Sequence, residues 1–205
     1  MQIKNKAFLV FFLLIISFFL KTNLSADEFD ISAKEIIVDK QNNTVIGIGS
    51  VIAIDSENNT IKADKIIYEK SKEVLNAKGS VKIYDIYNNI LFTDEAVYDK
   101  SNNIITTYKN SKLTLEDGYV LKTNIIYYKI DKKTLSSNQN SIFSDSDGNT
   151  IIVDMFQYEI KKNIFSSVGK IKVTDKQKNK YYFKKIYIDT KEKEMIGSDV
   201  SVLLD

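Results

Sequence analysis

Residues 61–85 read IKADKIIYEKSKEVLNAKGSVKIYD, and this stretch decides the fold. It contains two runs of about ten residues, each rich in β-branched and aromatic side chains, with a polar turn between them. Such runs, bounded by turn-forming residues, are typical of β-strands. Helical periodicity is absent after residue 26, so the sequence predicts an all-β protein.

The same pattern recurs every 30 residues, as in LFTDEAVYDKSNNIITTYKNSKLTLED from Leu91 and IIVDMFQYEIKKNIFSSVGKIKVTD from Ile151. A repeat of this length is typical of a solenoid, in which neighbouring copies stack and bury a shared apolar face. The sequence therefore predicts six repeats and about twelve strands. The copies begin at Ile31, Ile61, Leu91, Leu121, Ile151 and Tyr181.

The apolar pattern changes parity inside the first strand of each repeat. Ile61 and Ala63 are apolar, and so are Ile66 and Tyr68, which stand at even rather than odd positions. Because successive residues of a strand point to opposite faces, a bulge or bend must lie between the two pairs if both face inward. We therefore expect a crease that runs along the whole array.

The second strand of each repeat carries a small residue in the middle of its apolar face. One interpretation is a bend or a close approach of two sheets, and the other is space for a guest molecule inside the fold. Both remain open from the sequence. The residues are Gly47, Ala77, Thr107, Ser137, Ser167 and Gly197.

The N-terminus has the order of a secretory signal peptide. Lys4 and Lys6 precede the apolar run 7–20, and small residues follow at 25–26. The run is shorter than the roughly 18 to 20 residues of a spanning helix. We expect cleavage after Ala26, which leaves 27–205 as one domain. A lipoprotein anchor is excluded because no Cys is present.

The composition excludes most catalytic chemistry. The chain has no His and no Cys, and all 29 of its basic residues are Lys. Nucleophile–imidazole pairs, thiolate or imidazole metal sites and arginine clamps are therefore impossible. We expect a non-enzyme without a metal site or cofactor. Because Lys alternates with Asp and Glu along the chain, we expect no nucleic-acid partner.

The stretch ADKIIYEK at 63–70, with LNAKGSVKI at 75–83 and TDEAVYDK at 93–100, resembles the OstA-like repeat. Periplasmic lipopolysaccharide transport proteins of the LptA type share this repeat with the periplasmic part of LptD. The resemblance covers 27–205 and is weakest in the fourth copy, at Asn124, Lys129 and Gln139. It implies an open β-jellyroll, or β-taco, with an apolar groove.

The resemblance also implies a function and partners. The module would bind the lipid A acyl chains of lipopolysaccharide in the periplasm, as part of a head-to-tail bridge to the outer membrane. Its protein partners would be other jellyroll modules, further copies of itself or an outer-membrane barrel. The chain has no Walker motif, so the energy source would lie in another protein.

We assign candidate sites to the inward positions and to the C-terminal end. The same inward residues would also suit a packed core, so a secreted β-solenoid structural protein or adhesin without a lipid ligand is the alternative. The chain ends at the repeat position of Asp55 and Asp85, which predicts an unpaired edge and an end-to-end interface at Val200 and Val202. The predicted groove residues are Ile36, Ile66, Tyr68, Leu75, Ile83, Tyr98, Ile105, Ile126, Phe156 and Phe165.

Overall fold

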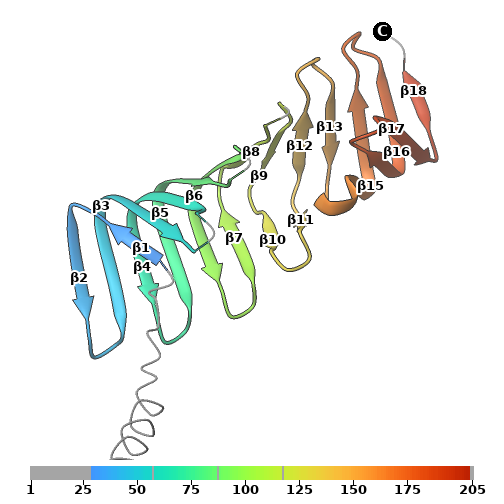
Figure 1. Cartoon of the computed structure of the whole chain (residues 1–205). Helices are drawn as coiled ribbons and strands as arrows, with labels where there is room; N and C mark the ends of the chain where they lie inside the picture. The colour runs from blue at the N-terminus through green and yellow to red at the C-terminus, as the bar shows by residue number, and fades with distance from the viewer. Residues whose placement is uncertain (1–28, 57, 87, 117, 204–205) are drawn as a thin grey trace, which may run out of the picture.

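The computed structural model describes residues 29–56, 58–86, 88–116 and 118–203, which form one antiparallel sheet of eighteen strands (Figure 1). The predicted signal peptide, 1–26, lies outside the described residues. Within the described part, no helix is long and apolar enough to cross a membrane. The all-β prediction is confirmed.

Within the described ranges, the strands follow one another along the chain with a single short 3₁₀ turn, Ile160–Lys162, among them. Their bounds are β1 Phe29–Ser32, β2 Glu35–Asp39, β3 Thr44–Asp55, β4 Thr60–Glu69, β5 Val74–Tyr84, β6 Ile90–Asp99, β7 Ile104–Tyr108, β8 Ser111–Thr114, β9 Val120–Thr123, β10 Tyr127–Lys129, β11 Thr134–Ser137, β12 Ser141–Ser144, β13 Thr150–Val153, β14 Phe156–Glu159, β15 Ile164–Thr174, β16 Lys180–Asp189, β17 Glu194–Ser198 and β18 Ser201–Leu203.

The number of strands differs from the expected twelve because six of the extended runs are broken at the crease. Strands β3 to β6, β15 and β16 cross the crease unbroken, whereas the other runs are divided into pairs such as β7 and β8. The crease divides the sheet into two walls. The first wall contains β1, β8, β9, β12, β13 and β18, and the second wall contains β2, β7, β10, β11, β14 and β17. The six unbroken strands belong to both.

The crease lies where the change of parity predicted a bend. On β4, Ala63 and Ile66 are buried, whereas Asp64 and Lys65 between them are exposed. The pairing of β4 with β5 shifts register at this point, between Lys62 and Lys65. The extra residue lies on β5, where Gly79 and Ser80 have φ of 78° and 48°. This left-handed backbone suits glycine, which has no Cβ to clash.

A left-handed residue also ends each turn of the second wall. In all of these turns but the last, its carbonyl oxygen accepts a hydrogen bond from a backbone N–H about 27 residues further along, as in Ile130 N to Asn103 O at 2.9 Å and Ile160 N to Lys133 O at 3.0 Å. Asn tolerates this backbone better than Lys or Glu does. The turns of successive repeats are thereby joined in a ladder. The residues in this conformation are Asn43, Glu73, Asn103, Lys133, Asn163 and Lys193.

The turns of the first wall are held by a recurring pair of Asp and Asn. Asp145 accepts hydrogen bonds from the backbone N–H and the side-chain amide of Asn149, at 2.9 and 2.6 Å. Asp55, Asp85 and Asp175 bind the Asn four residues later in the same way. Burial raises the pKa of Asp145, but the hydrogen bonds outweigh it and hold that pKa below its ordinary value. These acids are therefore structural parts of the turns.

The turn ladder predicts opposite effects for two substitutions at equivalent positions. Lys133→Asn should stabilise the fold and Asn103→Lys should destabilise it, each by about 0.5 to 1 kcal/mol, because only the ease of the left-handed backbone changes. Urea unfolding measures both. Equal effects of the same sign would contradict this account of the turn.

Candidate lipid-binding face between the walls

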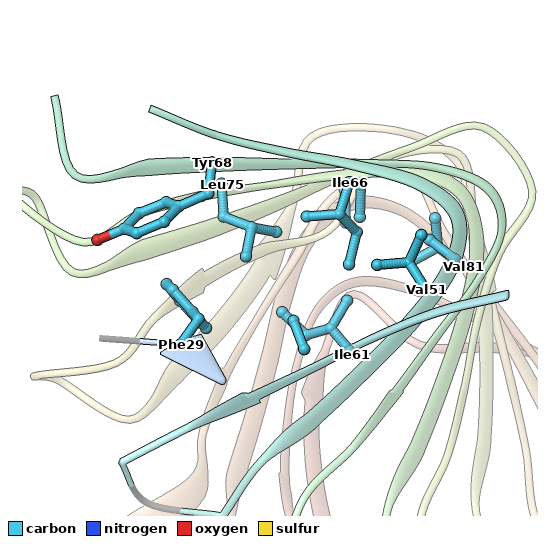
Figure 2. Packing of buried hydrophobic residues seen from close by; sticks show 11 residues of the cluster. Phe29, Val51, Ile61, Ile66, Tyr68, Leu75 and Val81 are labelled. Atoms are coloured by element: carbon cyan, nitrogen blue, oxygen red, sulfur yellow. The ribbon is translucent and has the colours of Figure 1, made fainter. Parts of the chain in front are cut away.

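The two walls face each other across an apolar interior. Figure 2 shows Ile66, Tyr68 and Leu75 projecting from the second wall toward Phe29 and Ile61 of the first. Val51 and Val81 lie beside them near the bend. A second apolar cluster, toward the C-terminus, includes Leu121, Ile126, Val153, Phe156, Phe165, Ile171, Val173, Phe183 and Ile186. The inner face is therefore apolar in both the N-terminal and the C-terminal parts of the array.

Eight of the ten predicted groove residues belong to these clusters or pack against them. Ile66, Tyr68 and Leu75 are buried in the N-terminal cluster, and Ile83 and Tyr98 lie partly buried at its edge. Ile126, Phe156 and Phe165 are buried in the C-terminal cluster.

The other two predicted residues lie outside both clusters. Ile105 is half-buried in β7, whereas Ile36 is 46% exposed. Ile36 stands on β2, which pairs only with β3 among the described strands, so one flank of its side chain is open. The burial expected for Ile36 is therefore absent because this strand is at the end of the sheet.

Aromatic side chains close the interior at two places. The Phe29 ring lies 5.1 Å from that of Tyr68 and 5.8 Å from that of Tyr98, both edge-on. Phe143 of the first wall lies 4.8 and 4.6 Å from Phe156 and Phe165 of the second. Sequence reasoning missed both first-wall partners, although Phe143 stands at an inward position of its repeat. In this state the walls contact each other directly.

Side chains alone hold the walls together across the interior. Among the described strands, each pairing joins neighbours within one wall or along an unbroken strand, and none joins one wall to the other. Away from the crease, the walls can therefore separate without the loss of a backbone hydrogen bond. The contacts that a guest would have to replace there include the ring packing of Phe29 on Tyr68 and of Phe143 on Phe156.

The small residues in the middle of the second strands lie at the crease, where the walls approach most closely. Ala77, Thr107, Ser137 and Ser167 are all buried. A Cβ added to Gly47 would lie 2.8 Å from Cγ1 of Val51, which is closer than real side chains approach. The close-approach interpretation is therefore favoured, and the idea of guest space at Gly47 is wrong.

Buried hydroxyl groups line the crease between the two apolar clusters. Thr107 Oγ1 lies 2.6 Å from Ser111 Oγ and accepts a hydrogen bond from Ile126 N at 2.9 Å. Thr93 Oγ1 lies 3.1 Å from the same Ser111 Oγ. Sequence reasoning missed this hydroxyl seam, whose only signal is the Thr and Ser at inward positions of the third and fourth copies. The seam closes the middle of the crease with polar contacts.

The hydroxyl seam predicts that replacing one of its hydroxyl groups by a methyl group of the same size lowers the stability of the fold. Thr107→Val keeps the shape but leaves Ile126 N without its acceptor, and should destabilise the fold by about 1 to 3 kcal/mol. Urea unfolding measures the difference. The matched control is Thr106→Val on the outer face of the same strand, which should change stability by less than about 0.5 kcal/mol. Equal costs at both positions would contradict the role of the seam.

A separate hollow of about 420 Å³ opens on the outer face of the second wall. Tyr127 and Tyr187 stand at its two sides, with Ser136, Gln157 and Ser166 on the strands between them. These residues alternate along their strands with the buried inward residues. The hollow shares only Phe156 with the predicted groove residues.

No family model and no curated protein matches the chain. Among solved structures, the chain is similar to LptH from Pseudomonas aeruginosa, the LptA homologous periplasmic component of the lipopolysaccharide transport device. The match has 12% identity, covers 86% of this chain and 94% of LptH, and has a TM-score of 0.24. This is the same family that the sequence repeat resembles.

The TCP10 domain of Danio rerio CPAP also matches, as wild type and as the E1021V mutant. The identities are 11% and 10%, each match covers 70% of this chain and 95% of the domain, and both TM-scores are 0.15. At these TM-scores, neither CPAP nor LptH defines the function of this chain. The function proposed below rests on the chain's own residues.

Proposed function

We propose that this chain is an exported, non-enzymatic lipid carrier that holds the acyl chains of lipopolysaccharide between its two walls. It acts in the periplasm as one module of a bridge to the outer membrane. The observation that supports this most is the apolar inner face between two walls whose described strands are joined only at the crease. Acyl chains can then replace the contacts between walls without breaking the sheet.

The energy of such a replacement is favourable only where the walls are incompletely packed. Burial of one CH₂ group is worth about 0.8 kcal/mol, so a chain of ~12 carbons gains about 10 kcal/mol at most. The acyl chain displaces contacts between the walls, and the free energy of those lost contacts must be subtracted from this gain. We therefore expect lipid to enter where inner side chains remain partly exposed, at Ile83, Tyr98 and Ile105, rather than at the fully buried Ile66 and Leu75.

Movement along the array needs an external drive. Because the inner surfaces of successive repeats are packed to different degrees, a bound acyl chain would have to pass sites of unequal free energy. No Walker motif is present in the sequence. An ATPase elsewhere in the bridge would supply the direction.

A structural protein with a permanently packed core is the second candidate. The ring contacts between Phe143 and both Phe156 and Phe165, together with the complete burial of Ile66, favour it. Such a protein would keep its walls closed and bind no lipid.

Photo-crosslinking separates these two functions. A photoreactive amino acid in place of Tyr98, on the inner face of β6, should capture lipopolysaccharide in cells. The same amino acid in place of Val97, the outward neighbour, should capture at least about ten-fold less. Mass spectrometry of the adducts identifies lipid A. Equal labelling at both positions, or none at Tyr98, would contradict the carrier and favour the packed structural protein.

We propose that the two free edges of the sheet join copies of the chain, or related modules, head to tail. Among the described strands, β17 and β18 pair only with β16, and β1 and β2 only with β3. Apolar side chains are exposed along both edges. They are Ile36, Ile37 and Val38 at one end and Met195, Ile196, Val200, Val202 and Leu203 at the other.

The pairing of β15 with β16 indicates how such a junction would be aligned. Phe165 lies opposite Ile188, and the same register one repeat later places Met195 opposite Val38 of the next copy. The predicted interface residues Val200 and Val202 are 52% and 53% exposed at this edge. Val202 lies opposite Tyr181, an inward residue of β16, so its side chain is on the inner face and would add an apolar contact to the junction.

Cysteine crosslinking tests the junction in a chain that has no natural Cys. Met195→Cys with Val38→Cys should give disulfide-linked dimers and longer chains on gels, whereas Ile196→Cys with Val38→Cys should not, because its side chain faces the other way. Adding Val202→Glu should abolish the ladder. The matched control is Val168→Glu. Val168 is similarly exposed, at 54%, but it lies on β15, which is not an edge strand. Equal ladders from both cysteine pairs would contradict the junction.

A further inference from the structure

Lysines gather in one row on the outer face of the first wall. The row crosses ten strands, and each member lies directly opposite the next in the sheet. It contains five lysines and no carboxylate. We call this set the lysine row, and its members in spatial order are Ile52, Lys62, Lys82, Phe92, Lys112, Lys122, Ile142, Ile152, Lys172 and Tyr182.

The surroundings of the lysine row add little negative charge. The next outward row lies nearer the turns of the first wall, and it runs across the sheet from Asp30 at one end to Leu203 at the other. Apart from Lys180, the residues between these two ends are all Ile, Val, Thr, Ser or Tyr. Asp64, Asp94 and Asp154 lie on the other side, at the crease. There Asp64 lies against Gly79, and Asp94 accepts a hydrogen bond from Asn110 at 2.8 Å.

The arrangement of these lysines is unfavourable for an isolated protein. Lys62 lies directly opposite Lys82, and Lys112 directly opposite Lys122. Like charges at directly opposed positions destabilise a sheet. Among the described residues, none of the row's lysines forms an ion pair. The closest compensation is from aromatic rings, with Lys62 Nζ 5.2 Å from the Tyr84 centroid and Lys82 Nζ 5.4 Å from that of Phe92. An anionic partner would relieve the repulsion.

We infer that the lysine row docks on the surface of an anionic phospholipid membrane. Lysines near such a surface are attracted by the phosphate headgroups. Strands lie about 4.8 Å apart, so the two lysine pairs are about 14 Å apart along the row. The apolar members between and beyond them, Phe92, Ile142, Ile152 and Tyr182, suit the boundary between headgroups and acyl chains.

Nucleic acid fits this row less well. Three of the five apolar members are Ile, which cannot stack on bases as aromatic rings do. The row also lacks Arg, the residue most often used to recognise bases and phosphates. The sequence alone shows no cluster of positive charge, because the paired strands bring together lysines that are 10 to 30 residues apart along the chain. The row lies on the outer face, so this inference is independent of lipid binding between the walls.

Vesicle binding of the full chain tests the inference. The measured quantity is the ratio of partition coefficients for phosphatidylglycerol and phosphatidylcholine vesicles, in which the contribution of the N-terminal apolar segment is the same for every variant. Replacing Lys62, Lys82, Lys112 and Lys122 by Gln should lower the ratio by about five-fold for each lysine, and at least 50-fold in all. High salt should lower the ratio of the unsubstituted chain in the same direction.

The matched control replaces four exposed or half-exposed lysines in turns of the second wall by Gln: Lys132, Lys133, Lys161 and Lys193. It changes the net charge equally and should lower the ratio less than five-fold. If both quadruple variants lowered the ratio equally, net charge alone would explain the binding, and the inference would be overturned. So would an unchanged ratio in the lysine-row variant, or binding to duplex DNA that depends on the row and exceeds vesicle binding.

Thermal unfolding keeps the test independent of folding defects. Because substitution removes like-charge pairs, the lysine-row variant should unfold at or above the temperature of the unsubstituted chain. If the quadruple variant does not fold, Lys62→Gln with Lys112→Gln removes one member of each pair and should lower the ratio about 25-fold. An unchanged ratio in that folded double variant would overturn the inference.

Discussion

The crease in the sheet is the constraint on which the rest of the structure depends. At Ala63–Ile66 the inward positions are three residues apart, and on the facing strand they are four apart, from Ala77 to Val81. The left-handed pair Gly79 and Ser80 accommodates the extra residue. A uniform two-residue alternation through this point would turn half of the apolar side chains toward water. The bend keeps them on one concave face.

The crease also sets what the interior can do. Each wall satisfies its backbone hydrogen bonds internally, so the two walls are held together by side chains such as Phe29 with Tyr68 and Phe143 with Phe156. Apolar contacts are non-directional, and an acyl chain can substitute for them at little cost in geometry. The hydroxyl seam around Thr107 and Ser111 closes the crease itself by directional hydrogen bonds. The proposed entry of acyl chains would therefore open the rim of the interior and leave the crease closed.

The 30-residue period gives both faces of the sheet their chemistry. Equivalent residues of successive repeats recur on every second strand, and antiparallel pairing places two positions of the repeat opposite each other. Two inward positions therefore form an apolar row, and two outward positions form the lysine row. The pairing of Lys62 with Lys82 and of Lys112 with Lys122 is a direct result of this alignment. The same fold thus has an apolar row on the inside, where we propose that acyl chains bind, and a lysine row on the outside, which we propose meets phosphates.

The sequence by itself determined the strands, the crease and the inward face, because each follows from the alternation of residues within about ten positions. Ile66, Leu75, Ile126 and Phe156 could be placed inside for this reason. Only the tertiary structure decided which walls touch, why Ile36 is exposed at an end strand, and how the lysines gather. Those features depend on neighbours across strands, such as Lys62 and Lys82, which are remote in sequence and are interspersed along the chain with acids that the fold turns elsewhere.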